Sequence, residues 1–192
     1  MLYLASSSPR RAELLTQIGV EFTILKVDID ETPQPGEPVA DLVLRLSREK
    51  AQAARLHLHA MHSDDLILAA DTLIHLQGQI LGKPDSDSGC CAMLQRLSGR
   101  RHQVLTAIAL INAAGETWQR CSHNEITFRP LSEPEIKRYC DSTEPLDKAG
   151  AYAIQGRAAI FIRRLEGSYS SVMGLPLFET AELLQQAGYE LI

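Results

Sequence analysis

The sequence has no apolar run long enough to cross a bilayer, no excess of positive charge and no Cys-x-x-Cys motif. A membrane span takes about 18 apolar residues, so none is predicted, and the first residues lack the basic start of a secretory leader. The 19 Lys and Arg are outnumbered by 24 Asp and Glu, which gives a net charge of -5. Nucleic-acid and membrane-surface binders depend on excess Lys and Arg, so neither partner is expected.

The four cysteines are Cys90, Cys91, Cys121 and Cys140. Two of them are adjacent, which suits a disulfide framework poorly. We therefore expect reduced thiols, no structural zinc and a cytoplasmic protein.

The composition is that of an ordinary globular chain, with 192 residues of which 45% are hydrophobic and 22% charged. This length suffices for one core or for two small lobes that share a cleft, and no linker or repeat divides it. The patterning predicts strands at about 2–5, 20–27, 66–70, 73–76, 101–112, 117–129 and 159–165. It predicts helices at about 9–18, 39–59, 87–97, 131–140 and 177–187. We expect a single α/β domain over residues 1–192, with a Pro- and Gly-rich loop at 32–38 that could close over a cleft.

Residues 6–11, Ser-Ser-Ser-Pro-Arg-Arg, lie between an apolar strand and an amphipathic helix. A serine can cap the helix, and Pro9 is tolerated as its first residue because the missing N–H would be unpaired there. The remaining backbone N–H groups, the hydroxyls and the two guanidinium groups suit a phosphate. An ordinary capped helix with solvated arginines is the alternative.

Two charged residues fall at positions that favour burial or a ligand. Lys50 lies four residues beyond Leu46 on the inner face of its helix, so its ammonium needs an anionic partner unless it extends to the rim. Asp71 follows the apolar run 66–70, and ligands gather beyond the carboxyl ends of strands in open α/β sheets. Asp71 is therefore a candidate metal ligand or general base, or else a turn residue.

Four further side chains are weaker candidates. Lys83 could reach the same region as Asp71, although this spacing is also typical of a surface lysine. Gln155 stands among small residues, and its amide can read the edge of a nucleobase or simply face water. His102 and His123 are expected to be packing or surface residues rather than metal ligands.

Six motifs in order resemble those of the Maf-like nucleotide pyrophosphatases over essentially the whole chain. They are residues 6–11, Arg48-Glu49-Lys50-Ala51, Ala70-Asp71-Thr72, Leu97-Ser98-Gly99 with His102, Asp147-Lys148-Ala149-Gly150, and Gly167-Ser168-Tyr169 with Gly174-Leu175-Pro176. The resemblance implies a curved mixed sheet flanked by helices, with two lobes around a central cleft. It also implies a homodimer that hydrolyses nucleoside triphosphates between the α and β phosphates with a divalent metal, Mg or Mn.

Residues 152–159 are similar to the branch of this family that acts on dTTP and UTP. Carried over by position, Asp71 would be the proton acceptor, and Arg10, Thr72 and Gln155 would govern substrate choice. The family usually has Asn two residues after the Tyr of its Gly-Ser-Tyr motif, where this chain has Ser171.

A triphosphate carries about four negative charges, which an acidic protein must meet with a local positive pocket. The residues expected to bind the phosphates are Ser6, Ser8, Arg10, Arg11, Lys50, Lys83 and Lys148. Magnesium prefers oxygen ligands and keeps several waters, so Asp71 and Glu31 are its candidate protein ligands. Thymine and uracil share one hydrogen-bonding edge that Gln155 can meet, which predicts weak discrimination between dTTP and UTP.

The sequence is also compatible with other functions. The same chemistry could act on 7-methyl-GTP or on a modified pyrimidine nucleotide. The family has also been linked to septum formation and division arrest, so a non-catalytic nucleotide-binding regulator is an alternative, as is a simple phosphate-binding module.

Overall fold

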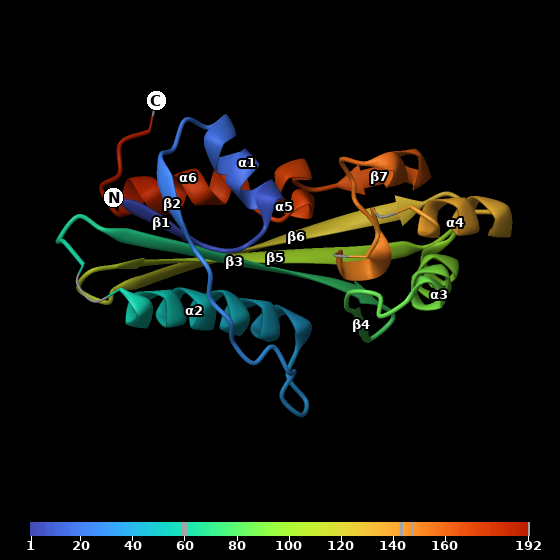
Figure 1. The fold of residues 1–192 in the computed structure, drawn as a ribbon, viewed down its shortest axis with the longest axis horizontal. Coiled ribbons are helices and arrows are strands. Elements are labelled where there is room, and N and C mark those ends of the chain that lie inside the picture. The colour runs from blue at the N-terminus through green and yellow to red at the C-terminus, as the bar shows by residue number, and fades with distance from the viewer. Residues whose placement is uncertain (59–60, 143, 147, 192) are drawn as a thin grey trace. The chain divides into compact units, whose positions relative to one another are not determined.

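The computed structural model describes residues 1–58, 61–142, 144–146 and 148–191, which form both strands and helices (Figure 1). The strands are β1 (Leu2–Ala5), β2 (Phe22–Leu25), β3 (Leu66–Leu76), β4 (Gln79–Leu81), β5 (Arg101–Asn112), β6 (Thr117–Phe128) and β7 (Ile162–Glu166). The helices are α1 (Pro9–Gln17), α2 (Val39–His57), α3 (Asp87–Leu97), α4 (Glu133–Cys140), α5 (Tyr169–Met173) and α6 (Leu177–Gln186). Two short 3₁₀ helices, η1 (Ala149–Ala151) and η2 (Arg157–Phe161), precede β7.

The seven strands form one sheet in the order β2-β1-β3-β5-β6-β7, with β4 paired to β3. β1 pairs in parallel with β2 and with β3, whereas the β3–β4 and β6–β7 pairs are antiparallel. β5 and β6 are neighbours joined by a four-residue turn, which only an antiparallel hairpin allows. The predicted fold class, a mixed sheet flanked by helices, is confirmed.

Several predicted elements differ from the observed ones. The strand predicted at 159–165 begins only at Ile162, because Arg157–Phe161 form the 3₁₀ helix η2, and β4 is not among the predicted strands. The two strands expected at 66–70 and 73–76 are one strand, β3, and the loop expected before Gly174 contains the short helix α5. Helix α2 ends at His57. His59, where the end of this helix was expected, lies outside the described residues. Within the part of the chain that the structure describes, no helix is both long and apolar enough to span a membrane.

The chain divides into two compact units, each described by itself below. Unit 1 comprises Met1–Asp71, Thr106–Ser122 and Gly174–Ile192, and unit 2 comprises Thr72–Leu105 and His123–Met173. Each of the strands β3, β5 and β6 is divided between the two units.

In unit 1, α2 packs on one face of the sheet while α1 and α6 lie on the other (Figure 1). The cluster beneath α2 contains small side chains from both layers, including Ala51 and Ala54 of the helix and Ala5 and Ala69 of the strands. Because side chains alternate along a strand, Ile67, Ala69 and residue 71 share this face. The small residues allow α2 to approach the sheet closely.

In unit 2, the core contains a cluster of aromatic rings in edge-to-face contact. Phe128 packs against His102, Tyr152 and Phe161, with ring centroids 5.1, 4.9 and 6.2 Å away. His102 Nε2 is 2.8 Å from the Tyr152 hydroxyl, and burial lowers the pKa of His102 to about 4. The His102 ring is therefore uncharged near pH 7, and it packs in this core as a neutral side chain.

The loop at 32–38 contains no helix or strand, as predicted. Arg45 of α2 holds it at both ends, through an ion pair with Glu37 (Nε–Oε1 2.7 Å) and a hydrogen bond to the Thr32 carbonyl (3.1 Å). The hydrogen bond from Arg45 lowers the pKa of Glu37 to about 2. Closure of this loop over a substrate stays a prediction.

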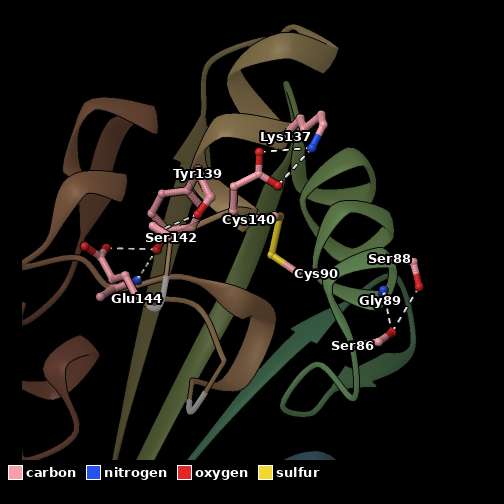
Figure 2. Close-up of a disulfide and its surroundings, with 11 residues drawn as sticks. Ser86, Ser88, Gly89, Cys90, Lys137, Tyr139, Cys140, Ser142 and Glu144 are labelled. Atoms are coloured by element: carbon pink, nitrogen blue, oxygen red, sulfur yellow. Dashed lines mark hydrogen bonds and ion pairs between the residues drawn. A yellow bond between two sulfur atoms is a disulfide. The ribbon is translucent and has the colours of Figure 1, made fainter.

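A disulfide joins Cys90 of α3 to Cys140 of α4, with the two Cα atoms 5.9 Å apart (Figure 2). The expectation of reduced thiols is wrong for this pair, while Cys91 and Cys121 are free. The sequence spacing of 50 residues gives no sign of the pairing, because it arises only when α3 packs against α4.

The disulfide predicts a definite thiol count. In denaturant without a reductant, two cysteines per chain should react with an alkylating agent, and all four should react after reduction. Because the bond closes a loop of about 50 residues, Cys90→Ala with Cys140→Ala should lower the free energy of unfolding by roughly 3 to 4 kcal/mol. Cys91→Ala with Cys121→Ala is the control, and four reactive thiols without reductant would contradict the pairing.

Candidate active site

The segment between β1 and α1 is organised by Ser6 and Arg11. Pro9 is the first residue of α1, and the N-cap Ser8 donates its backbone N–H to the Ser6 hydroxyl (3.2 Å). Arg11 Nη1 donates to the same hydroxyl (3.1 Å), and its Nε donates to the Gly174 carbonyl (2.8 Å). Arg11 therefore joins two of the sequence motifs, residues 6–11 and 174–176, within unit 1.

Charged groups of both signs surround Arg11. Burial, the largest cause, lowers the pKa of its guanidinium, and the positive charge of Arg10 lowers it further. The negative charges of Asp71 and Glu31 act in the opposite direction and raise it. The structure thus gathers Ser6 and four of the predicted charged residues in one part of unit 1.

Lys50 lies between two carboxylates. Its Nζ is 2.6 Å from Asp71 Oδ1 and 2.6 Å from Glu31 Oε1. The side chains of Lys50 and Asp71 are only 14% and 8% exposed, whereas that of Glu31 is 58% exposed. The prediction that Lys50 points inward and needs an anionic partner is confirmed, and the partners are carboxylates.

The position of Asp71 corrects one expectation. Asp71 does not follow the end of a strand but lies within the continuous strand β3, at the residue where unit 1 passes into unit 2. Strand alternation places it on the same face as Ala69, and Lys50 extends from α2 on that face. The ammonium compensates the charge of this nearly buried carboxylate.

The remaining predicted residues, Thr72, Lys83, Lys148 and Gln155, belong to unit 2. Lys83 and Gln155 are exposed, and Thr72 and Lys148 are half-buried. Lys148 Nζ donates to the Glu144 carbonyl (2.8 Å).

Gly150, whose φ of +66° favours glycine, donates its N–H to the Gly82 carbonyl (2.9 Å). The segments that carry Lys83 and Lys148 therefore run side by side, while Asp147 of the same motif lies outside the described residues.

Asn124 is not among the residues predicted from the sequence. This buried residue donates to the Ser171 hydroxyl (2.8 Å) and the Val104 carbonyl (3.0 Å), and accepts from the Ser168 N–H (2.7 Å). Ser171, which stands where the family usually has Asn, is thus part of a buried structural network. Strand alternation with the apolar residues Ile126 and Phe128 is the signal that could have placed Asn124 inside.

Comparison with known proteins gives consistent matches over the whole chain. The family model described as Maf-like protein matches residues 1–187. A protein of Aromatoleum aromaticum named dTTP/UTP pyrophosphatase is 52% identical over 201 residues, which cover 99% of this chain and 97% of that protein. A protein of Methylobacillus flagellatus with the same name is 53% identical, with 97% and 92% covered.

Two solved structures share the fold at low sequence identity. The Ham1 protein of Staphylococcus aureus matches with a TM-score of 0.53 and 15% identity, covering 97% of this chain and 98% of that one. A HAM1 protein from Coxiella burnetii matches with a TM-score of 0.50 and 17% identity, covering 96% and 98%. At this identity the likeness shows the fold alone.

The buried ion pair predicts strong coupling between Lys50 and Asp71. Lys50→Met leaves a carboxylate that is 8% exposed without its ammonium, and should lower the free energy of unfolding by about 3 kcal/mol. Adding Asp71→Asn should restore much of this loss, because residue 71 then carries no charge that needs the ammonium. Urea denaturation of both single variants and the double variant measures the coupling.

The control is Lys137→Met, which breaks an exposed pair with Asp141 and should cost less than about 1 kcal/mol. Additive losses in the Lys50 and Asp71 variants would show that the two side chains do not depend on one another.

Proposed function

The chain belongs to the Maf-like protein family, as the resemblance in its sequence implied. From this premise we propose that it hydrolyses dTTP and UTP to the nucleoside monophosphate and pyrophosphate. Support comes from relatives about half identical over the whole chain that are named dTTP/UTP pyrophosphatase. The observation that carries the proposal is the buried Asp71 carboxylate, held at 2.6 Å by the Lys50 ammonium and close to the Arg11 guanidinium.

Asp71 is assigned the role of general base. Its Oδ1 accepts a hydrogen bond from Lys50, which fixes the orientation of the carboxylate, and Oδ2 is the oxygen assigned to the attacking water. The water oxygen forms a bond to the α phosphorus, its proton passes to Asp71, and the bond from that phosphorus to the bridging oxygen breaks. Pyrophosphate leaves with the electron pair of that bond.

In unit 1, the groups proposed to bind phosphate are Ser6, Ser8, Arg10, Arg11 and Lys50. Lys83 and Lys148 of unit 2 stay phosphate ligands predicted from the sequence. Arg11 is already oriented by Ser6 and Gly174, so little side-chain entropy would be lost when a phosphate binds. A guanidinium group can also bind two phosphate oxygens at once.

The carboxylates of Asp71 and Glu31 fit a divalent cation such as Mg or Mn. One oxygen of each carboxylate lies 2.6 Å from the same Lys50 nitrogen, so the two side chains lie near one another. Across the residues described, no group of three or more His, Cys, Asp or Glu could hold a metal ion. The arrangement therefore suits a cation that takes its other ligands from phosphate oxygens and water, as Mg commonly does. When bound, such a cation would neutralise charge on the phosphates.

Base selection is assigned to Gln155, with contributions from Arg10 and Thr72. The exposed Gln155 amide can pair with N3–H and a carbonyl of thymine or uracil. The thymine methyl group changes only apolar contact, so dTTP and UTP should differ by roughly tenfold or less in kcat/KM.

Domain organisation, assembly and location stay predictions from the sequence. We propose one functional domain over residues 1–192, a homodimer and a cytoplasmic location, with no nucleic-acid or membrane partner.

Pyrophosphate release from a panel of nucleoside triphosphates tests the proposed function. With Mg or Mn, dTTP and UTP should be hydrolysed in preference to purine nucleotides. Asp71→Asn should lower kcat by about 10²- to 10⁴-fold, the usual contribution of a general base. Asp64→Asn is the matched control, because Asp64 is exposed just before the same strand.

Two results would overturn the proposal. One is full activity of Asp71→Asn, and the other is turnover of 7-methyl-GTP without turnover of dTTP or UTP.

A further inference from the structure

Gln155 stands at the tip of a tight turn in unit 2. The Gly156 N–H donates to the Ala153 carbonyl (3.1 Å), which closes the turn. Ala153 and Ile154 are buried, at 4% and 7% exposure, whereas Gln155 is exposed. The direction of the Gln155 side chain therefore depends on how the two ends of this turn are held.

The first end of the turn is held by Tyr139 of α4. The Ala153 N–H donates to the Tyr139 hydroxyl (3.3 Å), and that hydroxyl donates to Glu144 Oε1 (2.9 Å). The Tyr139 ring is itself buried against Phe161, with centroids 5.2 Å apart. Figure 2 shows Tyr139 and Glu144 with the adjacent Cys140 joined to Cys90 of α3.

The second end of the turn is held by Glu144 directly. Its Oε2 accepts the Arg157 N–H (3.0 Å), and its Oε1 accepts a longer hydrogen bond from the Ala158 N–H (3.5 Å). A Cβ atom at Gly156 would collide with this carboxylate, so a larger residue there would displace Glu144 from its hydrogen bonds. The Glu144 carbonyl also accepts from Lys148, which fixes the backbone of the glutamate.

We propose that Glu144 is a positioning residue for Gln155 and thereby sets the base specificity of the enzyme. One carboxylate reaches both ends of the turn, directly at Arg157 and through the Tyr139 hydroxyl at Ala153. An amide side chain forms two hydrogen bonds to the edge of a base at the same time only when its backbone is held accurately in place. A displacement of about 1 Å can lower the rate 10²-fold. The inference rests on the proposed function, in which Gln155 reads the base.

The test compares selectivity in four proteins: wild type, Glu144→Gln, Gln155→Ala and the double variant. The kcat/KM values are measured for dTTP and for CTP, whose base presents a different hydrogen-bonding edge. Glu144→Gln keeps the size of the side chain but removes its negative charge. It also places an NH₂ group against one of the O–H or N–H groups that donate to Glu144 in the wild type. The ratio of dTTP to CTP should fall about tenfold or more in Glu144→Gln. In the Gln155→Ala background, Glu144→Gln should change the ratio no further, because one residue acts through the other.

Hydrogen exchange gives a readout that does not depend on activity. The amides of residues 153–158 should exchange faster in Glu144→Gln than in wild type. Glu133→Gln, an exposed residue of α4, is the matched control and should leave both exchange and selectivity unchanged. If Glu144→Gln does not fold, Tyr139→Phe removes the same hydroxyl link, keeps the ring against Phe161 and should give the same two effects.

The outcomes separate this inference from the proposed function. Wild type that hydrolyses neither dTTP nor UTP would overturn the proposed function and this inference with it. Wild-type turnover with unchanged selectivity in Glu144→Gln, or an equal change in the Gln155→Ala background, would overturn this inference alone.

Discussion

The ammonium of Lys50 determines how the candidate active site in unit 1 is built. It contacts Asp71 and Glu31 at 2.6 Å each and so joins α2, β3 and the loop that follows β2. Without this cation, two carboxylates would repel one another and Asp71 would carry an unpaired charge in a nearly buried position, which is costly. The small side chains of Ala51, Ala54 and Ala69 complete the arrangement, because they let α2 lie close enough to the sheet for the ammonium to reach its partners.

Both units use a charged side chain to fix the geometry of groups with a proposed function. In unit 1, Arg11 binds Ser6 and Gly174, so the segment before α1 and the segment before α6 are held together. In unit 2, the Glu144 carboxylate accepts backbone N–H groups next to the turn that carries Gln155. Charge-assisted hydrogen bonds are stronger than neutral ones, and here they restrain loops that regular secondary structure does not reach.

Local patterns in the sequence predict much of this structure. The helical spacing of Lys50 with Leu46 predicts its inward direction, and the Ser-Pro sequence predicts the start of α1 at Pro9. Features that depend on distant residues could not be predicted in this way. The Cys90–Cys140 disulfide requires α3 to pack on α4, and Asp71 finds its partner Lys50 on the distant helix α2. Glu144 gains its proposed role from contacts with residues 139 and 157. No single motif is specific for the family, but the six motifs in this order predict it. The matching family model confirms the prediction.

Hydrolysis of dTTP in water enriched in oxygen-18 shows most directly which bond the enzyme breaks. If Asp71 activates water for attack at the α phosphorus, one labelled oxygen should appear in dTMP and none in the pyrophosphate, as mass spectrometry of the two products can determine. Label in the pyrophosphate, or release of dTDP and orthophosphate, would contradict the proposed chemistry.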